Sequence, residues 1–94
     1  MDNVTIQQLL VDHAYPSHMI EQTIEKINRF QPKIKKAFEG WVTSGKEPNI
    51  EVQGYTFSQL RKDYGMKAIG AFITLDWLIR DPENATKSLK RGIR

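Results

Sequence analysis

The residues of this chain that could perform acid–base or metal chemistry gather in one short segment. Asp12, His13 and His18 lie close together in the sequence, and imidazole and carboxylate groups are common general acids, general bases and zinc ligands. Their spacing, across Tyr15-Pro16-Ser17, matches no familiar metal-binding pattern. We therefore expect surface or capping roles for these three residues, and we expect neither a metal ion nor another cofactor.

Other reactive arrangements are missing from the sequence. The 94 residues include no cysteine, so a thiolate nucleophile, a thiolate metal site and a disulfide are all excluded. No serine stands in a Gly-x-Ser-x-Gly turn, and the glycines are too scattered to form a phosphate-binding loop. These features predict that the protein is not an enzyme.

One acidic residue falls within an apolar stretch. A helical wheel places Asp76 on the side of Ile69 and Ile73, where an unpaired carboxylate would be costly. Arg80 follows one helical turn later. We expect Asp76 to form a structural ion pair or a hydrogen bond to a nearby helix cap. The alternative is a partly buried carboxylate that serves a functional site.

The positive charge is concentrated in two stretches. Nine of the fourteen Lys and Arg residues lie within residues 26–36 and 87–94, and the rest of the chain is acidic. If the chain is helical across Pro32, four cations of the first stretch line up opposite an apolar face. Such a face can be ordinary solvation, but it also suits an acidic protein or phosphate groups. The candidate partner-binding or phosphate-binding surface comprises Lys26, Arg29, Lys33, Lys36, Lys87, Lys90, Arg91 and Arg94.

The stretch YTFSQLRKDYGM, residues 55–66, predicts two helices that meet at a tight corner. Thr56 followed by Gln59 fits a capping box, which begins a helix. Gly65 then supplies a left-handed stop before a second helix at about 66–80. The layout is helix-turn-helix-like over residues 56–80. It supports an alternative function, a DNA-binding protein that contacts the phosphate backbone through basic helix faces. The DNA-contact corner would then comprise Arg61, Lys62 and Lys67.

Two features count against base readout at this corner. Arg61 stands where the motif usually has a small residue that lets the helices approach. The second helix begins with Lys67, Ala68 and Ile69, and so offers few side chains that could read bases in the major groove. Because this helix is apolar nearly all round, we expect it to be the buried centre of the fold.

Helix signals in the first half of the chain are interrupted by one proline. A short first helix should begin after a cap at Asn3 or Thr5 and end near His13. An apolar face at helical spacing then spans residues 20–41. Pro32 lies in its middle, so either one helix kinks there or a second helix begins at the proline.

The remaining signals are a loop and a last helix. Gly45 should end the preceding helix, and residues 45–54 form a loop with at most one very short strand near residues 50–53. Asp81-Pro82 should begin a last helix that ends near Gly92. The expected fold is all-α: a single small domain, residues 1–94, of five to six helices around a buried central helix at about 66–80.

Composition and charge complete the functional hypothesis. The chain is 39% hydrophobic and 27% charged, which is typical of a globular domain. Its N-terminus lacks a basic signal-peptide region, and its longest apolar run is too short to cross a membrane, so we expect a cytoplasmic protein without membrane contact. We expect a non-enzymatic interaction module whose partner is a protein, with nucleic acid binding and a homodimer as open alternatives. The expected surface is a basic stripe or the region of Tyr55 and loop 45–54. No stretch resembles a particular protein family.

Overall fold

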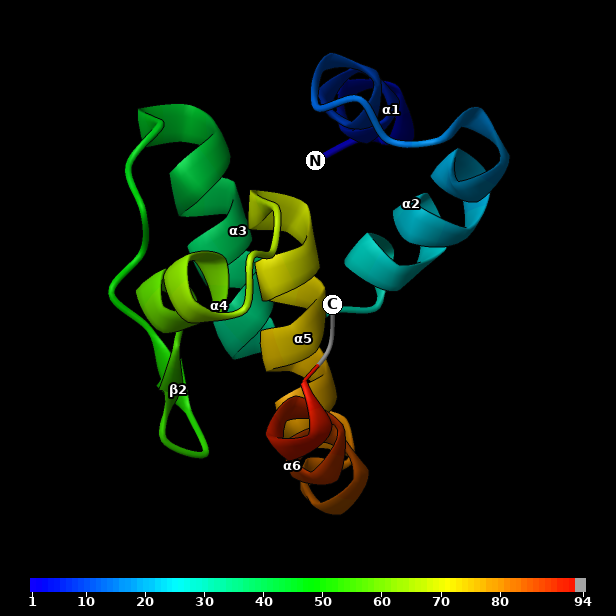
Figure 1. Cartoon of the computed structure of the whole chain (residues 1–94). Helices are drawn as coiled ribbons and strands as arrows, with labels where there is room; N and C mark the ends of the chain where they lie inside the picture. Colours follow the sequence, from blue (N-terminus) through cyan, green and yellow to red (C-terminus); the bar gives the residue numbers. More distant parts are fainter. Residues whose placement is uncertain (93–94) are drawn as a thin grey trace. The chain divides into compact units, whose positions relative to one another are not determined.

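The computed structural model describes residues 1–92. They divide into two compact units, the first Met1–Phe30 and the second beginning at Gln31. The described part contains six α-helices, one short 3-10 helix and one pair of two-residue strands (Figure 1). The predicted all-α class is therefore confirmed. The prediction of a single domain over residues 1–94 stays a prediction.

The first unit is a pair of helices in contact with each other. Helix α1 (Asn3–Asp12) leads through η1 (Ser17–Met19) into α2 (Ile20–Asn28). The cap of α1 is Asp2, whose Oδ1 accepts a hydrogen bond of 2.8 Å from the Thr5 N–H. The sequence had suggested Asn3 or Thr5 instead. Asp2 is as good a cap by residue type, and Asn3 is free to accept a hydrogen bond from Asn28 of α2 at 2.8 Å.

Helix α1 ends in a Schellman motif that has an unusual residue at its left-handed position. The Tyr15 N–H donates to the Leu10 carbonyl and the Ala14 N–H to the Val11 carbonyl, each at 3.0 Å. Ala14 has a φ of 58°, a conformation in which glycine is the usual residue. Pro16 follows and prevents the helix from continuing.

Pro32 begins a new helix, which resolves the two alternatives left by the sequence. Helix α2 ends at Asn28, and α3 (Pro32–Ser44) has the proline at its first position, where the missing N–H leaves no bond unmade. Gly45, with a φ of 72°, ends α3 as expected. The chain is therefore not continuously helical across Pro32, and the condition for a single basic stripe on one helix is not met.

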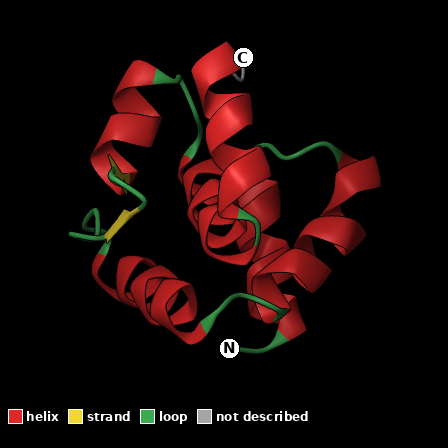
Figure 2. Ribbon diagram, turned by 90° about the horizontal axis from the view of Figure 1, so that it is seen from below, coloured by secondary structure: helices red, strands yellow, loops and turns green. Residues whose placement is uncertain are grey.

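A small hairpin follows the loop after α3. Strand β1 (Glu51–Val52) pairs antiparallel with β2 (Tyr55–Thr56), so the short strand expected near 50–53 has a partner (Figure 2). The two residues between them, Gln53 and Gly54, both have positive φ, at 54° and 83°. A type I′ turn requires such values and brings two strands into register.

The corner at residues 56–80 has the predicted caps. Helix α4 (Phe57–Asp63) begins where the Thr56 Oγ1 accepts a hydrogen bond of 3.0 Å from the Gln59 N–H. Gly65 adopts a φ of 64° before α5 (Ala68–Arg80). Asp81 then precedes α6 (Pro82–Arg91), and its Oδ2 accepts from the Asn84 side chain at 2.8 Å.

Helix α5 is the buried helix of the second unit. It contacts α3, α4, α6 and β1, and Figure 1 shows the three helices beside it. Eight of its thirteen residues are buried, and only Arg80 is classed as exposed. Phe72 at its middle packs against Phe38 of α3 and Phe57 of α4, with ring centroids 5.3 and 4.7 Å apart. The buried central helix expected from the sequence is confirmed.

Candidate functional site

The residues with acid–base potential near the N-terminus have local roles in α1 and η1. The Asp12 Oδ1 accepts a hydrogen bond of 2.8 Å from the Gln8 side chain. His13 is the C-cap of α1, and its backbone N–H donates to the Leu9 carbonyl. His18 lies in η1 and is exposed. Within residues 1–92, no group of three or more His, Cys, Asp or Glu side chains is arranged to hold a metal ion.

Asp76 has the structural role expected of it. Its Oδ2 pairs with the Arg80 Nε at 2.6 Å, and its Oδ1 accepts from the Gln31 N–H at 2.8 Å. Gln31 is the N-cap residue of α3, whose first N–H groups have no partner within the helix. The carboxylate therefore neutralises a cation and caps a second helix at once, and the helix dipole of α3 favours its charge.

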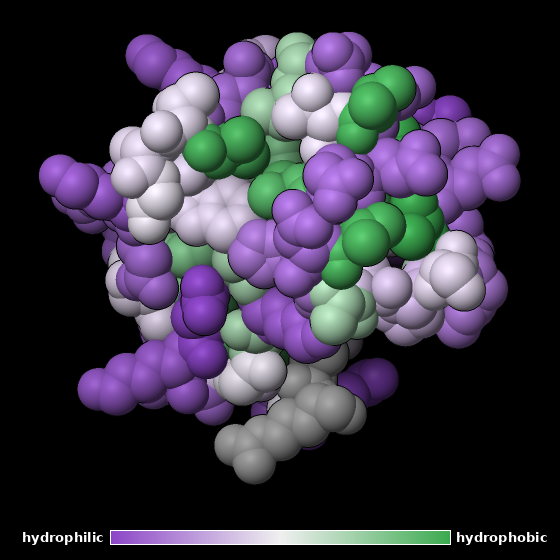
Figure 3. Space-filling model, turned by 90° about the horizontal axis from the view of Figure 1, so that it is seen from above, coloured by the Kyte–Doolittle hydropathy of each residue, from purple (hydrophilic) through white to green (hydrophobic). Residues whose placement is uncertain are grey.

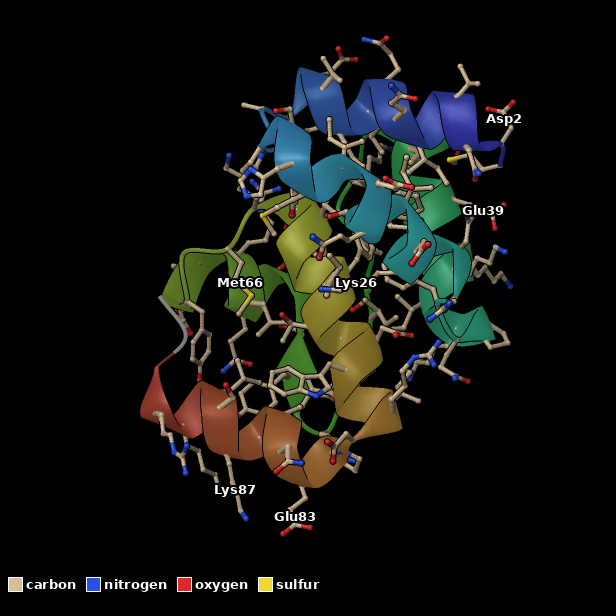
Figure 4. The ribbon with its side chains drawn as sticks, turned by 90° about the vertical axis from the view of Figure 1, so that its right-hand side faces the viewer. Asp2, Lys26, Glu39, Met66, Glu83 and Lys87 are labelled. Atoms are coloured by element: carbon tan, nitrogen blue, oxygen red, sulfur yellow. The ribbon has the colours of Figure 1, made fainter. Side chains whose placement is uncertain are left out.

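The predicted basic surface is divided among several elements. Lys26 lies in α2 and Arg29 directly after it, in the first unit, whereas Lys33 and Lys36 lie on α3 in the second. On α6, Lys87 pairs with Glu83 at 3.2 Å, and the two extend from the same side of the helix (Figure 4). The other predicted cations of this helix are Lys90 and Arg91, which are exposed in its last turn, while Arg94 lies outside the described residues.

The helix-turn-helix-like corner lacks an exposed reading helix. Base readout requires side chains that project from the start of the second helix. In α5 these positions are buried, including Ala68, Ile69 and Ala71. Of the three predicted contact residues, Arg61 lies 3.9 Å from Glu47, Lys62 is exposed, and Lys67 is the N-cap residue of α5. The geometry does not favour base-specific contacts.

A groove runs beside α3 in the second unit. It has a volume of about 680 Å³, and its second wall is the loop segment 46–51. The residues that α3 contributes lie at helical spacing on one face of that helix. They are Lys33, Lys36, Ala37, Gly40, Trp41 and Ser44. We call this site the α3 groove.

Aromatic packing fixes the α3 wall of the groove. The Trp41 ring lies 5.5 Å from Phe72 and 6.0 Å from Phe38, measured between ring centroids. Its side chain is half-buried, so one part packs on the core and another part faces the groove. A tryptophan anchored in this way presents a rigid apolar surface at little entropic cost.

Hydrogen bonds fix the loop wall at several points. The Lys33 Nζ donates to the Glu51 carbonyl at 3.0 Å, which joins α3 to the end of the loop. Ile50 is buried, and its carbonyl accepts from the Phe57 N–H. The Glu47 Oε2 accepts from Ser58 at 3.0 Å while its Oε1 faces Arg61. The loop is therefore held against both α3 and α4.

The rim of the α3 groove is cationic. Lys36 and Lys46 are both exposed, and no carboxylate in residues 1–92 lies within ion-pair distance of either ammonium group. Of the two acidic lining residues, Glu47 is paired with Arg61 and Ser58, and the exposed Glu51 is a single negative charge against the lysines Lys33, Lys36 and Lys46. Because exposed charges that lack a partner are free to pair with an incoming group, the rim attracts anions more than cations.

The α3 groove combines the two binding surfaces that the sequence predicts as alternatives. Lys33 and Lys36 belong to the predicted basic surface, and residues 46–51 belong to the predicted loop surface. Sequence reasoning missed Gly40 and Trp41. Their spacing from Lys36 and Ala37 on a helical wheel is the signal that could have identified them.

No close packing contact in this chain explains why a glycine occupies position 40 of α3. It lies in the middle of α3 and is exposed, and a Cβ atom built on it would meet nothing within 4 Å. Its φ is not in the positive range. Glycine in a helix interior costs about 1 kcal/mol relative to alanine. The open space beside it belongs to the α3 groove.

The large hydrophobic residues exposed in the described part lie in the first unit. They include Val4 and Val11, which are 76% and 52% exposed and lie seven residues apart, and so on one face of α1. Figure 3 shows hydrophobic residues at the surface as separate patches among hydrophilic ones.

Comparisons with protein-family models, with curated proteins and with solved structures found no match to this chain. No helix within residues 1–92 is both long enough and apolar enough to span a bilayer.

Proposed function

We propose that this chain is a non-enzymatic interaction module that binds a partner protein through the α3 groove. The observation that supports this function is the groove itself, where a rigidly packed, half-exposed Trp41 is flanked by unpaired lysines. Tryptophan is enriched among the residues that dominate binding energy at protein interfaces. The cysteine-free composition suits the reducing cytoplasm, where we place the protein.

A protein partner fits the groove better than nucleic acid does. Trp41 and Ala37 line it beside the lysines, and they suit an apolar side chain, which a protein segment supplies and a phosphate backbone does not. The residues at the start of α5 are also buried, so this helix has no exposed side chains that could read bases. DNA binding through Arg61, Lys62 and Lys67 is therefore the alternative outcome of the experiment below.

Affinity capture with the full chain as bait tests the proposal. A lysate of the source cells is divided into a nuclease-treated and an untreated half, and bound proteins and bound nucleic acid are both analysed. We expect a specific protein that is retained after nuclease treatment. Capture of nucleic acid alone, lost on treatment, would replace the proposal by the DNA-binding alternative.

A matched pair of variants connects the captured protein to the groove. Gly40→Gln places a neutral side chain in the groove, where the structure has room for its Cβ. Glu39→Gln introduces the same residue at the preceding position, whose side chain extends outward from α3 (Figure 4) and does not line the groove. We expect Gly40→Gln to abolish capture and Glu39→Gln to leave it intact. Equal capture by both variants would place the binding surface elsewhere.

Self-association through the exposed face of α1 is the second part of the proposal. Val4 and Val11 give this face two apolar side chains that are more than half exposed. Sedimentation of the wild type over a range of concentrations should show a dimer, and the double change Val4→Ser with Val11→Ser should leave only monomer. A wild type that stays monomeric throughout would remove this part and leave the groove proposal untouched.

A further inference from the structure

The charges of the α3 groove define what kind of protein segment it can accept. Of its two acidic residues, Glu47 is paired with Arg61 and Ser58, whereas the Glu51 carboxylate has no ion-pair partner in the described residues and is outnumbered by the three lysines of the lining. The Lys33 ammonium donates to the Glu51 carbonyl. Lys36 and Lys46 remain without an ion-pair partner in the described residues, one on each wall. An acidic segment would find two cations to pair with, whereas a basic segment would be repelled by both.

The lining of the groove also has an apolar part, which we call its floor. Trp41 and Ala37 from α3 and Pro48 from the loop are all half-buried there. Beside them Gly40 leaves a space that an alanine or larger residue would reduce. The floor therefore suits a large apolar side chain, because burial against an aromatic ring and a bare backbone removes apolar surface from water.

The length of the groove limits the segment that it can hold. The α3 face from Lys33 to Ser44 is about 16 Å long at 1.5 Å per residue. An extended chain covers about 3.3 Å per residue, so roughly five residues fit along it. The volume of about 680 Å³ agrees with a short segment rather than a folded domain.

We propose that the α3 groove binds a short acidic segment of the partner protein, which inserts one large apolar side chain between Trp41 and Gly40 and pairs its carboxylates with Lys36 and Lys46. This inference rests on the proposed function and specifies the chemistry of the partner.

Selection from a library of random seven-residue peptides, with the full chain immobilised, tests the proposed chemistry. The retained peptides should carry a surplus of Asp and Glu around one Trp, Phe or Leu. Retained peptides that are neutral or basic, or the failure of any peptide to be retained, would overturn the inference.

The affinity of one retained peptide, measured in solution, then locates the contacts. Lys36→Glu and Lys46→Glu should each weaken binding about tenfold, because each change removes an attraction and adds a repulsion. Lys35→Glu is the matched control, since Lys35 is exposed on the same helix but does not line the groove. Equal weakening by Lys35→Glu would show a general charge effect and overturn the proposed contacts. Circular dichroism checks that each variant is folded.

The outcomes separate this inference from the proposed function. If Gly40→Gln abolishes capture of the cellular protein but Lys36→Glu and Lys46→Glu do not, the groove is the binding site and its partner is not acidic. If none of the three changes affects capture, the groove proposal fails together with this inference.

Discussion

At the scale of single residues, Asp76 joins two helices because each of its carboxylate oxygens has a different partner. One oxygen pairs with Arg80 of its own helix, and the other accepts the Gln31 N–H at the start of α3. The sequence predicted this role from the apolar surroundings of Asp76 and from the i, i+4 spacing to Arg80. It could not identify Gln31, which lies 45 positions away and meets Asp76 only in the folded chain.

Replacing Asp76 separates the two interactions. Asp76→Ala should lower the free energy of unfolding by about 2 kcal/mol, because it leaves the start of α3 without its acceptor. Arg80→Ala should cost less, about 1 kcal/mol, because the Asp76 carboxylate, although only 10% exposed, keeps its hydrogen bond from the Gln31 N–H at the start of α3. Urea denaturation of the two variants measures both values. Equal losses would mean that the ion pair, and not the bond to α3, carries the stabilisation.

Asp2 makes the stability of α1 depend on pH. The Thr5 N–H that donates to its carboxylate holds the pKa of Asp2 below its usual value. The charged form is therefore favoured in the folded state, so its stabilisation is present above the ordinary pKa of about 3.9 and is lost as pH falls through the lower folded value. We expect an NMR titration of the Asp2 carboxyl to show this lowered pKa. Asp2→Asn keeps an acceptor at the cap and should remove this part of the acid sensitivity, and an unchanged acid transition would show that the cap does not contribute to it.

At the scale of elements, helix ends were the features most readily predicted from sequence. Thr56, Gly65 and Gly45 each stand where the structure begins or ends a helix, because capping depends on one residue and its immediate neighbours. The hairpin was harder to predict. Its I′ turn uses Gln53 before Gly54, whereas Asn or Asp is the usual residue at the first position.

The end of α1 is held in a conformation that alanine tolerates poorly. Ala14 has a φ of 58°, and the left-handed region costs a non-glycine residue about 1–2 kcal/mol. Ala14→Gly removes this cost but adds chain entropy to the unfolded state, so we expect a net stabilisation of about 0.5–1 kcal/mol. Thermal and urea denaturation measure the difference. A loss of stability would indicate that the Schellman motif is not formed in solution.

Gly40 should lower the stability of α3 and, by leaving space in the groove, favour binding of the partner. Because a Cβ at this position meets no atom within 4 Å, Gly40→Ala should raise the free energy of unfolding by about 0.5–1 kcal/mol through helix propensity alone. The same methyl group narrows the α3 groove, so capture of the partner should weaken. Stability and capture are measured on the same variant. A gain in both would mean that Gly40 is not kept free for a ligand.

At the scale of the whole molecule, the chain forms two compact units, and the α3 groove belongs to the second. The all-α class and the buried helix could be predicted because both follow from local apolar patterns. The groove could not, because its walls are α3 and a loop whose position depends on the Lys33–Glu51 and Glu47–Ser58 contacts. Contacts between side chains and distant backbone groups leave no periodic pattern in a sequence.

Hydrogen exchange of the native protein should distinguish the amides of the buried helix α5 from those of the loop that lines the α3 groove. The amides of α5 after its first turn are hydrogen-bonded in a helix that contacts α3, α4, α6 and β1, so we expect them to exchange only through global unfolding. Their exchange free energy should match the free energy of unfolding from urea denaturation. The amides of residues 46–49 lie in a loop without helix or strand bonds and should exchange through local fluctuations instead. If the α5 amides exchange as fast as those of the loop, the helix is not buried, and a DNA-reading α5 becomes the better hypothesis. If the α5 amides exchange slowest, and a bound acidic peptide slows only the loop amides, the groove binds its ligand without a change in the packing around α5.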